Sequence, residues 1–345
     1  MHGTFLGDDP IGVGEILRRV GDSAGLLKKS LYSLADHIAE ATQKATASVA
    51  KDVANYCDAY REAFQALVGQ DPLVKLMEPS WSSQNHHVAR ADLAVRLLVQ
   101  LVEMNASENQ RVLLWGHSHA GNGFAILSNL LANHRETVEQ FFEAAGDQGS
   151  HWREARRILA EVPGPHPVAK SIDIVAFGTP VRYGWDPSGY RKLIHVLHDR
   201  EPKSERPSRT QPLFPPHGIR DMVSAKYGDW VQAFAVAGTD VPTGMSLNTH
   251  KRLGEILTRN LEEPKHGPDT RFIRPANIRD VCARWKTGTR CHADGVNLLV
   301  DYQPCGRKAA IGQPVEQAVF GHGVATTVEW LASHLALVLR SLSER

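Results

Sequence analysis

Residues 111–123, which read RVLLWGHSHAGNG, constrain the fold more than any other segment of this chain. The apolar run before Gly116 is typical of a buried parallel strand, and a helical pattern begins directly after Ser118. So tight a turn between strand and helix requires small residues two positions before and two positions after the serine. Gly116 and Ala120 meet this requirement, and Gly121 follows. The pattern predicts an exposed serine at a sharp strand-to-helix bend.

A serine in this position indicates nucleophilic chemistry. A serine hydroxyl is a weak nucleophile at neutral pH, so it needs a neighbouring base and donors that stabilise the oxyanion formed after attack. His117 and His119 flank Ser118, but neighbours on such a bend point elsewhere, so we expect neither ring to be the base. The backbone N–H of His119 is instead expected to donate to the oxyanion.

A second serine, Ser23, lies in a stricter Gly-x-Ser-x-Gly match between Gly21 and Gly25. The residues before it, EILRRV, place two adjacent arginines where a buried strand would be, whereas VLLW precedes Ser118. We interpret Ser23 as a helix N-cap or loop residue ahead of the helical stretch that starts near Leu26. The nucleophile is therefore assigned to Ser118.

Composition bounds the class of protein. The chain has 345 residues, 42% of them hydrophobic and 22% charged, so we expect one large domain over 1–345 with insertions. Lys and Arg total 39 against 38 Asp and Glu, which leaves no basic excess for a nucleic-acid partner. No apolar run reaches the roughly 20 residues of a membrane span, and no targeting signal is evident, which favours a cytoplasmic location.

The cysteines give no metal or disulfide framework. Four are present, and they lack the close pairs of a structural zinc site: Cys57, Cys282, Cys291 and Cys305. A single bridge between Cys282 and Cys291 is left open. We expect neither a metal nor a cofactor.

Strand and helix patterns alternate along the chain. Apolar runs predict buried strands at 111–116, 171–180, 192–199 and 297–302, and a short strand within 72–81. Helical periodicity covers 88–104, 119–133 and 326–342, and a helix pair or loop fills 134–168. This alternation predicts an α/β fold with a doubly wound, mostly parallel sheet that binds ligands beyond the carboxyl ends of its strands.

Two segments depart from this alternation. Residues 26–68 contain almost no helix-breaking residues and repeat apolar residues every three or four positions, which predicts a long helix. We expect it to fold back onto the sheet rather than to form a homodimer through a coiled coil. Residues 200–296 show no strong period and are interpreted as a cap or lid insertion. Within it, Trp230, Phe234 and Met245 are expected to form a small core of their own rather than an acyl site.

The chain resembles the α/β-hydrolase superfamily. The resemblance rests on the order of His2-Gly3, the Gly-x-Ser-x-Ala-Gly turn, an acid after a later strand and a histidine near the C-terminus. Residues 174–181 and 193–202 are similar to the lipase and esterase branches. The resemblance implies an α/β-hydrolase fold and cofactor-independent cleavage of carboxylic esters, lipid esters included. Amide and thioester substrates use the same machinery and are left open.

The resemblance also assigns the other members of a Ser-His-Asp triad. Asp199, at the end of the strand at 192–199, stands where the family has its acid, and His322 precedes the closing helix as the family order requires. The alternatives are Asp186 and Asp301 for the acid, and His195, His198, His217 and His250 for the base.

The amino terminus completes the expected site. The His2-Gly3 pair implies that Thr4 or Phe5 gives the second oxyanion N–H. Only Met1 precedes this pair, so we expect the strand that leads into it to be missing from the sequence. The alternative hypothesis is a non-catalytic assembly protein that associates through the 26–68 helix.

Overall fold

The computed structural model describes most of the central and C-terminal chain. The described residues are Met1, Val53, 56–69, 73–79, 81–104, 110–200, 221, 223–235, 240, 242, 244, 246–257, 292, 294–309 and 312–344. The following parts of the sequence predictions lie outside them: most of the 26–68 helix, His2, Gly3, Thr4, Phe5, Ser23, His217, Met245, Cys282, Cys291 and the side chain of Phe234.

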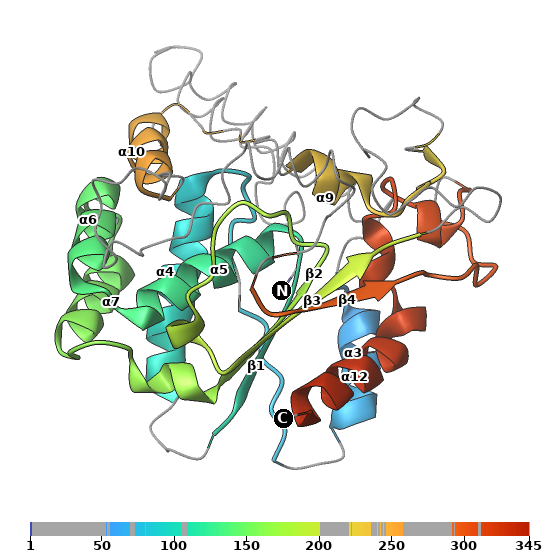
Figure 1. Ribbon diagram of the computed structural model, residues 1–345, viewed down its shortest axis with the longest axis horizontal. Coiled ribbons are helices and arrows are strands. Elements are labelled where there is room, and N and C mark those ends of the chain that lie inside the picture. Colours follow the sequence, from blue (N-terminus) through green and yellow to red (C-terminus); the bar gives the residue numbers. More distant parts are fainter. Residues whose placement is uncertain are drawn as a thin grey trace, which may run out of the picture.

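Four parallel strands form the sheet, in the order β1-β2-β3-β4 (Figure 1). They are β1 (Val112–His117), β2 (Ile172–Phe177), β3 (Lys192–His198) and β4 (Val296–Val300). All four were predicted, because each is a short apolar run that can be covered on both faces. The strand expected within 72–81 is wrong: its described residues have no regular secondary structure, and Leu73 is 90% exposed. The fold is an α/β fold with an all-parallel described sheet.

Alternate residues of β2 enter two separate cores. Ile172 and Ile174 belong to the larger core, whereas Val175 and Phe177 belong to a smaller one that includes Val338. Because successive side chains of a strand point to opposite faces, the two cores lie on opposite sides of the sheet. Helices therefore cover both faces, as the doubly wound prediction required.

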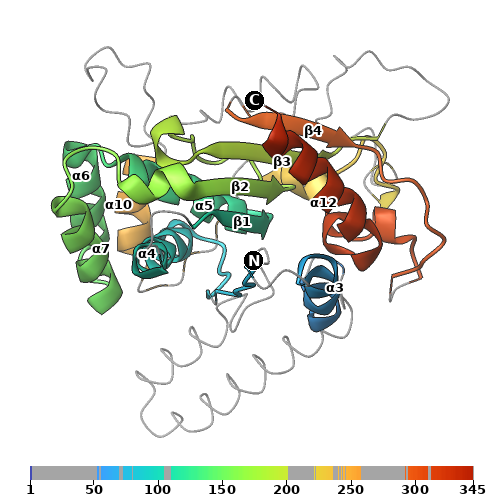
Figure 2. The same ribbon diagram turned by 90° about the horizontal axis from the view of Figure 1, so that it is seen from below.

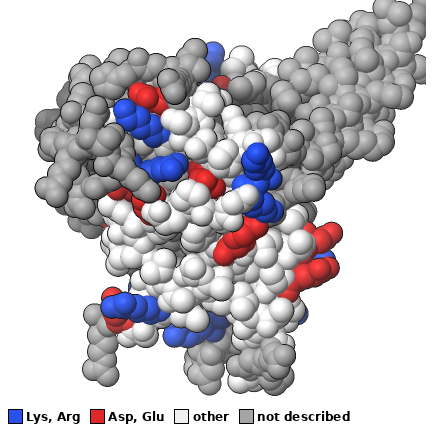
Figure 3. Space-filling view, turned by 90° about the vertical axis from the view of Figure 1, so that its right-hand side faces the viewer, with Lys and Arg blue, Asp and Glu red and all other residues white. Residues whose placement is uncertain are grey.

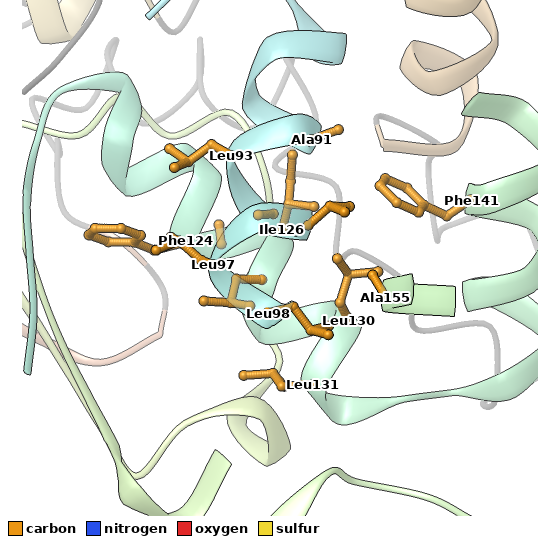
Figure 4. Close-up of a cluster of buried hydrophobic side chains, with 14 of the residues drawn as sticks. Ala91, Leu93, Leu97, Leu98, Phe124, Ile126, Leu130, Leu131, Phe141 and Ala155 are labelled. Atoms are coloured by element: carbon orange, nitrogen blue, oxygen red, sulfur yellow. The ribbon is translucent and has the colours of Figure 1, made fainter. Parts of the chain in front are cut away.

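Four helices build the larger core: α4 (His87–Met104), α5 (His119–Ala132), α6 (Arg135–Ala145) and α7 (Ser150–Ala160). On α6 and α7 the buried apolar residues recur every three or four positions and form one stripe, whereas α5 is buried on all sides. Figure 4 shows side chains of the four helices in this cluster: Leu93, Leu97 and Leu98 of α4, Phe124, Ile126, Leu130 and Leu131 of α5, Phe141 of α6 and Ala155 of α7. Each buried leucine or phenylalanine contributes about 2 kcal/mol through removal from water.

The opposite face carries α3 (Asp58–Val68) and α12 (Val328–Ser343), which lie together in Figure 2, apart from α4 and α5. The Phe64 ring of α3 packs against Trp115 of β1, with centroids 5.4 Å apart. His334 of α12 contacts Phe177 of β2, with centroids 5.0 Å apart. The helical part of the 26–68 prediction that is described, α3, thus folds onto the sheet.

Shorter elements connect these layers. The 3₁₀ helices are η2 (Pro167–Ser171), η3 (Pro187–Gly189), η4 (Val315–Gln317) and η5 (Gly323–Thr326). Two helices lie between β3 and β4 in the chain, α9 (Trp230–Ala235) and α10 (Leu247–Leu257). In Figure 1 both lie above the sheet, and α10 contacts α4 and α6. The cap interpretation of 200–296 stays a prediction.

Charges on the described surface are mixed in sign. On the face shown in Figure 3, Lys and Arg side chains alternate with Asp and Glu, and the described residues form no extended patch of one sign. Among the described helices, none combines the length and the apolar character that crossing a bilayer demands.

Candidate active site

Ser118 stands at the predicted bend between β1 and α5. Its backbone has φ 56° and ψ −131°, a left-handed conformation that is strained for a residue with a side chain. The Ser118 N–H donates to the carbonyl of Phe177 on β2 (2.8 Å), and the Thr179 hydroxyl donates to the carbonyl of Ser118 (3.0 Å). The residue exposes only 5% of its surface, less than the exposed position that we expected.

The small residues around Ser118 are required by close contacts. A Cβ at Gly116 would lie 2.4 Å from the ring of Phe124 and 3.3 Å from the Cβ of Ala120. A Cβ at Gly121 would lie 2.0 Å from the hydroxyl oxygen of Thr179. Glycine is therefore needed at 116 and 121, whereas alanine fits at 120 and is fully buried there. The strand end and the helix start approach each other as the motif requires.

The backbone before His322 has an unusual conformation. Val319, Phe320 and Gly321 precede it with φ angles of 53°, 55° and 83°. The first two are strained, because bulky side chains rarely adopt positive φ. A Cβ at Gly321 would lie 2.5 Å from the carbonyl oxygen of Gly228. The two glycines thus let the backbone before His322 touch the backbone before Asp229.

This contact brings a histidine and a carboxylate together. The Nδ1 of His322 lies 2.6 Å from Oδ2 of Asp229, and their side chains are 5% and 2% exposed. The other oxygen of Asp229 accepts a hydrogen bond from the Gln232 N–H (2.8 Å). Burial alone would raise the pKa of Asp229, but His322 and these hydrogen bonds hold it below its ordinary value. The carboxylate is therefore ionised and orients the His322 ring.

The structure places Asp229, and not the predicted Asp199, against His322. The Asp199 N–H donates to the carbonyl of Val300 (3.0 Å), which continues the ladder between β3 and β4. The N–H of Asp229 lies 3.4 Å from the carbonyl of His198, so Asp229 reaches the same end of β3 from a distant part of the chain. An acid from the 200–296 segment takes the place that we expected a strand-end acid to hold.

The two alternative acids have other partners. Asp186 accepts from the Ser188 N–H (2.9 Å) and pairs with His134 (3.0 Å) at the start of η3. Asp301 accepts from the side-chain amide of Gln303 (3.0 Å). Sequence reasoning missed Asp229 because 200–296 has no period that marks a strand end. The one available signal was its position between Ser118 and His322 in the chain order.

Residues on both sides of Ser118 contact the His322–Asp229 pair. His117, which precedes Ser118, donates from Nε2 to the carbonyl of His322 (3.0 Å), and the two rings are 4.3 Å apart. Gly178 follows the Phe177 carbonyl that binds Ser118, and a Cβ there would lie 2.8 Å from the carboxylate of Asp229. The same Cβ would lie 3.3 Å from the His322 ring. The serine backbone and the pair are therefore immediate neighbours.

The alternative histidines serve other contacts. The His195 ring stacks on His292 at 3.7 Å, and its Nε2 donates to the Asp294 carbonyl. His198 donates from Nδ1 to the carbonyl of Gly321 (2.7 Å) and so supports the segment before His322. His250 accepts at Nδ1 from the N–H of His87, the first residue of α4 (3.2 Å).

One expected oxyanion donor is available. The N–H of His119 is the first of α5, so it has no partner within the helix, and no described residue accepts from it. The positive end of the helix dipole also favours an anion there. Thr4 and Phe5 are not described. Met1 nevertheless donates to the Trp115 carbonyl (2.7 Å) and accepts from the His117 N–H (3.1 Å), so the chain leaves Met1 beside the end of β1.

One group of side chains has the composition of a metal site. Ligand atoms of His87, Asp240 and His250 lie within 4.8 Å of one another. Arg90 and Arg182, however, each bind one oxygen of Asp240. The two histidine rings stack with an interplanar angle of 22° and centroids 4.4 Å apart, so their nitrogen lone pairs lie in two separate, nearly parallel planes and do not converge on one point. Two cations and this ring geometry disfavour a metal ion.

The arrangement around Ser118 is suited to acyl transfer. It combines a strained serine at a helix start, a buried imidazole fixed by a carboxylate, and a backbone donor that no described residue binds. Comparisons of the chain with protein-family models, with curated proteins and with solved structures found no match.

Proposed function

We propose that this chain is a serine hydrolase with an α/β-hydrolase fold, which cleaves carboxylic esters through an acyl-enzyme on Ser118. The observation that carries the proposal is the buried pair of His322 and Asp229, 2.6 Å apart, next to a serine with φ 56°. Strained backbone and buried ion pairs are costly, and they concentrate where chemistry needs them.

Each residue has a defined role in this proposal. Because Nδ1 of His322 is bound to Asp229, its Nε2 takes the proton of the Ser118 hydroxyl as the oxygen attacks the ester carbonyl. The ionised Asp229 stabilises the imidazolium that forms. The N–H of His119 donates to the oxyanion, and the imidazolium then protonates the departing alcohol. Water, activated by the same ring, releases the acid and restores the serine.

The fold supports this reading in one further respect. The serine follows the carboxyl end of β1, and Asp229 contacts the carboxyl end of β3, which is the edge where parallel sheets bind ligands. Esters, lipid esters included, are proposed from the sequence resemblance. Amides and thioesters are tested against them with matched acyl groups.

Labelling with a fluorophosphonate probe tests the nucleophile. The wild-type protein is expected to form a covalent adduct, Ser118→Ala to form none, and Ser23→Ala to label like the wild type. Mass spectrometry of the adduct locates the modified serine. Absence of labelling in the wild type, or its loss in Ser23→Ala alone, contradicts the proposal, and the first result favours the non-catalytic assembly hypothesis.

A further inference from the structure

A second buried cluster of charges lies close to Ser118. The carboxylate of Asp240 is shared by two arginines: Nη2 of Arg90 lies 2.5 Å from Oδ1, and Arg182 binds Oδ2. The side chains of Arg90 and Arg182 are 0% and 7% exposed, and that of Asp240 is 13% exposed. Burial of three charges at one place is costly, so this cluster calls for an explanation.

The two arginines differ in how many of their guanidinium donors form hydrogen bonds. Arg90 also donates from Nε to the hydroxyl of Tyr183 (2.8 Å) and from Nη1 to the side-chain oxygen of Asn85 (2.9 Å). Arg182 has Asp240 as its partner, and its buried Nε has no hydrogen-bond partner among the described residues. Arg90 is thus fixed in the structure, whereas Arg182 retains an unused donor.

The described cluster also carries an excess of positive charge. Two guanidinium groups face one carboxylate, and the surrounding rings do not add negative charge. Burial, together with the charge of Arg90, lowers the pKa of His87 to about 2 and that of His86 to about 4, and Arg182 contributes to the lowering at His87. The pKa values of His119 and His250 are lowered by the same causes. At neutral pH these rings are uncharged, so one positive charge is left without a described partner.

The cluster is within reach of a molecule bound at Ser118. The segment after β2 contacts the catalytic pair through Gly178, donates to the Ser118 carbonyl through Thr179, and reaches Arg182 three residues later. Three residues span at most about 11 Å, which is the length of a small ester. His119, the neighbour of Ser118, is buried and feels the charges of Arg90 and Arg182.

We infer that Arg182, held beside Arg90 and Asp240, binds an anionic group of the substrate, a carboxylate or a phosphate. The inference rests on the proposed function, because it assigns the anion to the molecule that Ser118 cleaves. Asp240 neutralises the charge of Arg90 and binds Nη2 of Arg182. The Nε–H of Arg182, which has no described partner, donates to the anion. Guanidinium groups suit this role because their planar donors match both anions.

Binding of simple anions tests the site without any chemistry. Glutarate and inorganic phosphate, added separately, are expected to raise the melting temperature of the wild type by about 3 °C at saturation. Arg182→Gln is expected to abolish this shift, and Arg153→Gln, which removes an exposed arginine, is expected to retain it. The anion that acts at the lower concentration identifies the carboxylate or the phosphate as the natural group.

Two matched esters test whether the anion belongs to the substrate. Mono-4-nitrophenyl glutarate and 4-nitrophenyl pentanoate have acyl chains of the same length, and only the first is charged. Arg182→Gln is expected to lower kcat/KM for the glutarate ester about 30-fold and to leave the pentanoate ester within about threefold. Arg182→Lys, which keeps the charge, is expected to retain most of the preference and serves if Arg182→Gln does not fold.

The outcomes separate the two proposals. Equal losses for both esters in the Arg182 variants, or equal melting shifts in the wild type and Arg182→Gln, overturn the anion site. Absence of hydrolysis together with absence of fluorophosphonate labelling overturns the proposed function instead, while the melting shifts still decide whether Arg182 binds anions.

Discussion

In the described part of this molecule an aspartate between two arginines occurs twice, at opposite ends of the sheet. Near the amino end of β2, Asp173 pairs with Arg111 (2.5 Å) and Arg191 (2.6 Å), whose side chains are 58% and 32% exposed. Beyond the carboxyl end of β2, Asp240 pairs with the buried Arg90 and Arg182. The composition of the two groups is the same, and their access to water differs.

The two carboxylates respond in opposite ways. Burial raises the pKa of Asp173, because the charges of Arg111 and Lys192 offset only part of the cost of removing the carboxylate from water. Burial also opposes ionisation of Asp240, but Arg90 and Arg182 outweigh it and lower its pKa. Solvent screens the first group, whereas the second keeps its full electrostatic strength. The two groups thus share their composition and differ in how strongly burial and the neighbouring cations act on the carboxylate.

The largest expected effect concerns Asp229, the acid that contacts His322 at the carboxyl end of the sheet. Asp229→Asn is expected to lower kcat for 4-nitrophenyl pentanoate by about 10⁴-fold, because the His322 ring loses its orientation and the charge that stabilises it. Asp199→Asn is the matched control, and its effect is expected to stay below about tenfold. Steady-state kinetics with melting temperatures measures both. A larger loss of kcat in Asp199→Asn than in Asp229→Asn would show that Asp199, at the end of β3, is the acid.

The next largest expected effect is on the free energy of unfolding, when the aspartate of each group is replaced. Asp240→Asn leaves two buried guanidinium groups facing a neutral amide, and it is expected to lower the free energy of unfolding by about 3–5 kcal/mol. Asp173→Asn leaves arginines that water can solvate, and the expected loss is at most about 1 kcal/mol. Urea unfolding at pH 7 compares them. Equal losses would show that burial does not distinguish the two ends.

The pH dependence sharpens the comparison through His87. Arg90 donates to the Tyr183 hydroxyl, so that hydroxyl donates to Nδ1 of His87 and the ring is neutral. Its folded pKa is about 2, below the ordinary 6.5, so the unfolded chain binds the proton first as the pH falls. Stability is therefore lost on going down from pH 6.5, by about 1.4 kcal/mol per pH unit.

Removal of this ring should flatten the dependence. Between pH 7 and pH 5 the wild type is expected to lose about 2 kcal/mol more than His87→Gln, measured by urea unfolding. Arg153→Gln, which adds no titration in this range, is expected to follow the wild type. The prediction fails if the wild type and His87→Gln show the same slope.

The smallest effect concerns the ring that supports the base. His117→Phe keeps an aromatic ring beside His322 but removes the hydrogen bond to its carbonyl, so kcat is expected to fall about tenfold. His334→Phe is the control, because it removes a hydrogen bond from another buried ring, to the hydroxyl of Tyr302. Comparable losses of activity in both variants would indicate a general loss of stability.

Local sequence patterns sufficed to predict the strands of the described sheet and the turn at Ser118. Each strand of the described sheet is an apolar run, and the need for glycine at 116 and 121 follows from the geometry of one short turn. His322 was proposed as the base because it lies between the last strand and the closing helix. These features depend on residues that are close in the sequence or on the order of elements, which a single sequence displays.

Asp229 and Asp240 could not be found in the same way. Asp229 meets His322 because two glycines 93 positions apart, 228 and 321, allow their backbones to touch. Asp240 meets Arg90 across 150 positions. No periodicity or motif encodes such pairings. The sequence shows the residues, and tertiary packing selects their partners.

The left-handed pair Val319 and Phe320 sets a limit on engineering. Each residue also leaves 42% of its surface to solvent, so packing explains neither the side chain nor its conformation. Selection for heat resistance would readily replace them with glycine or asparagine, which relax at these angles. Such variants are expected to have a higher melting temperature and a lower kcat. The reason is that the backbone next to His322 would be less rigid.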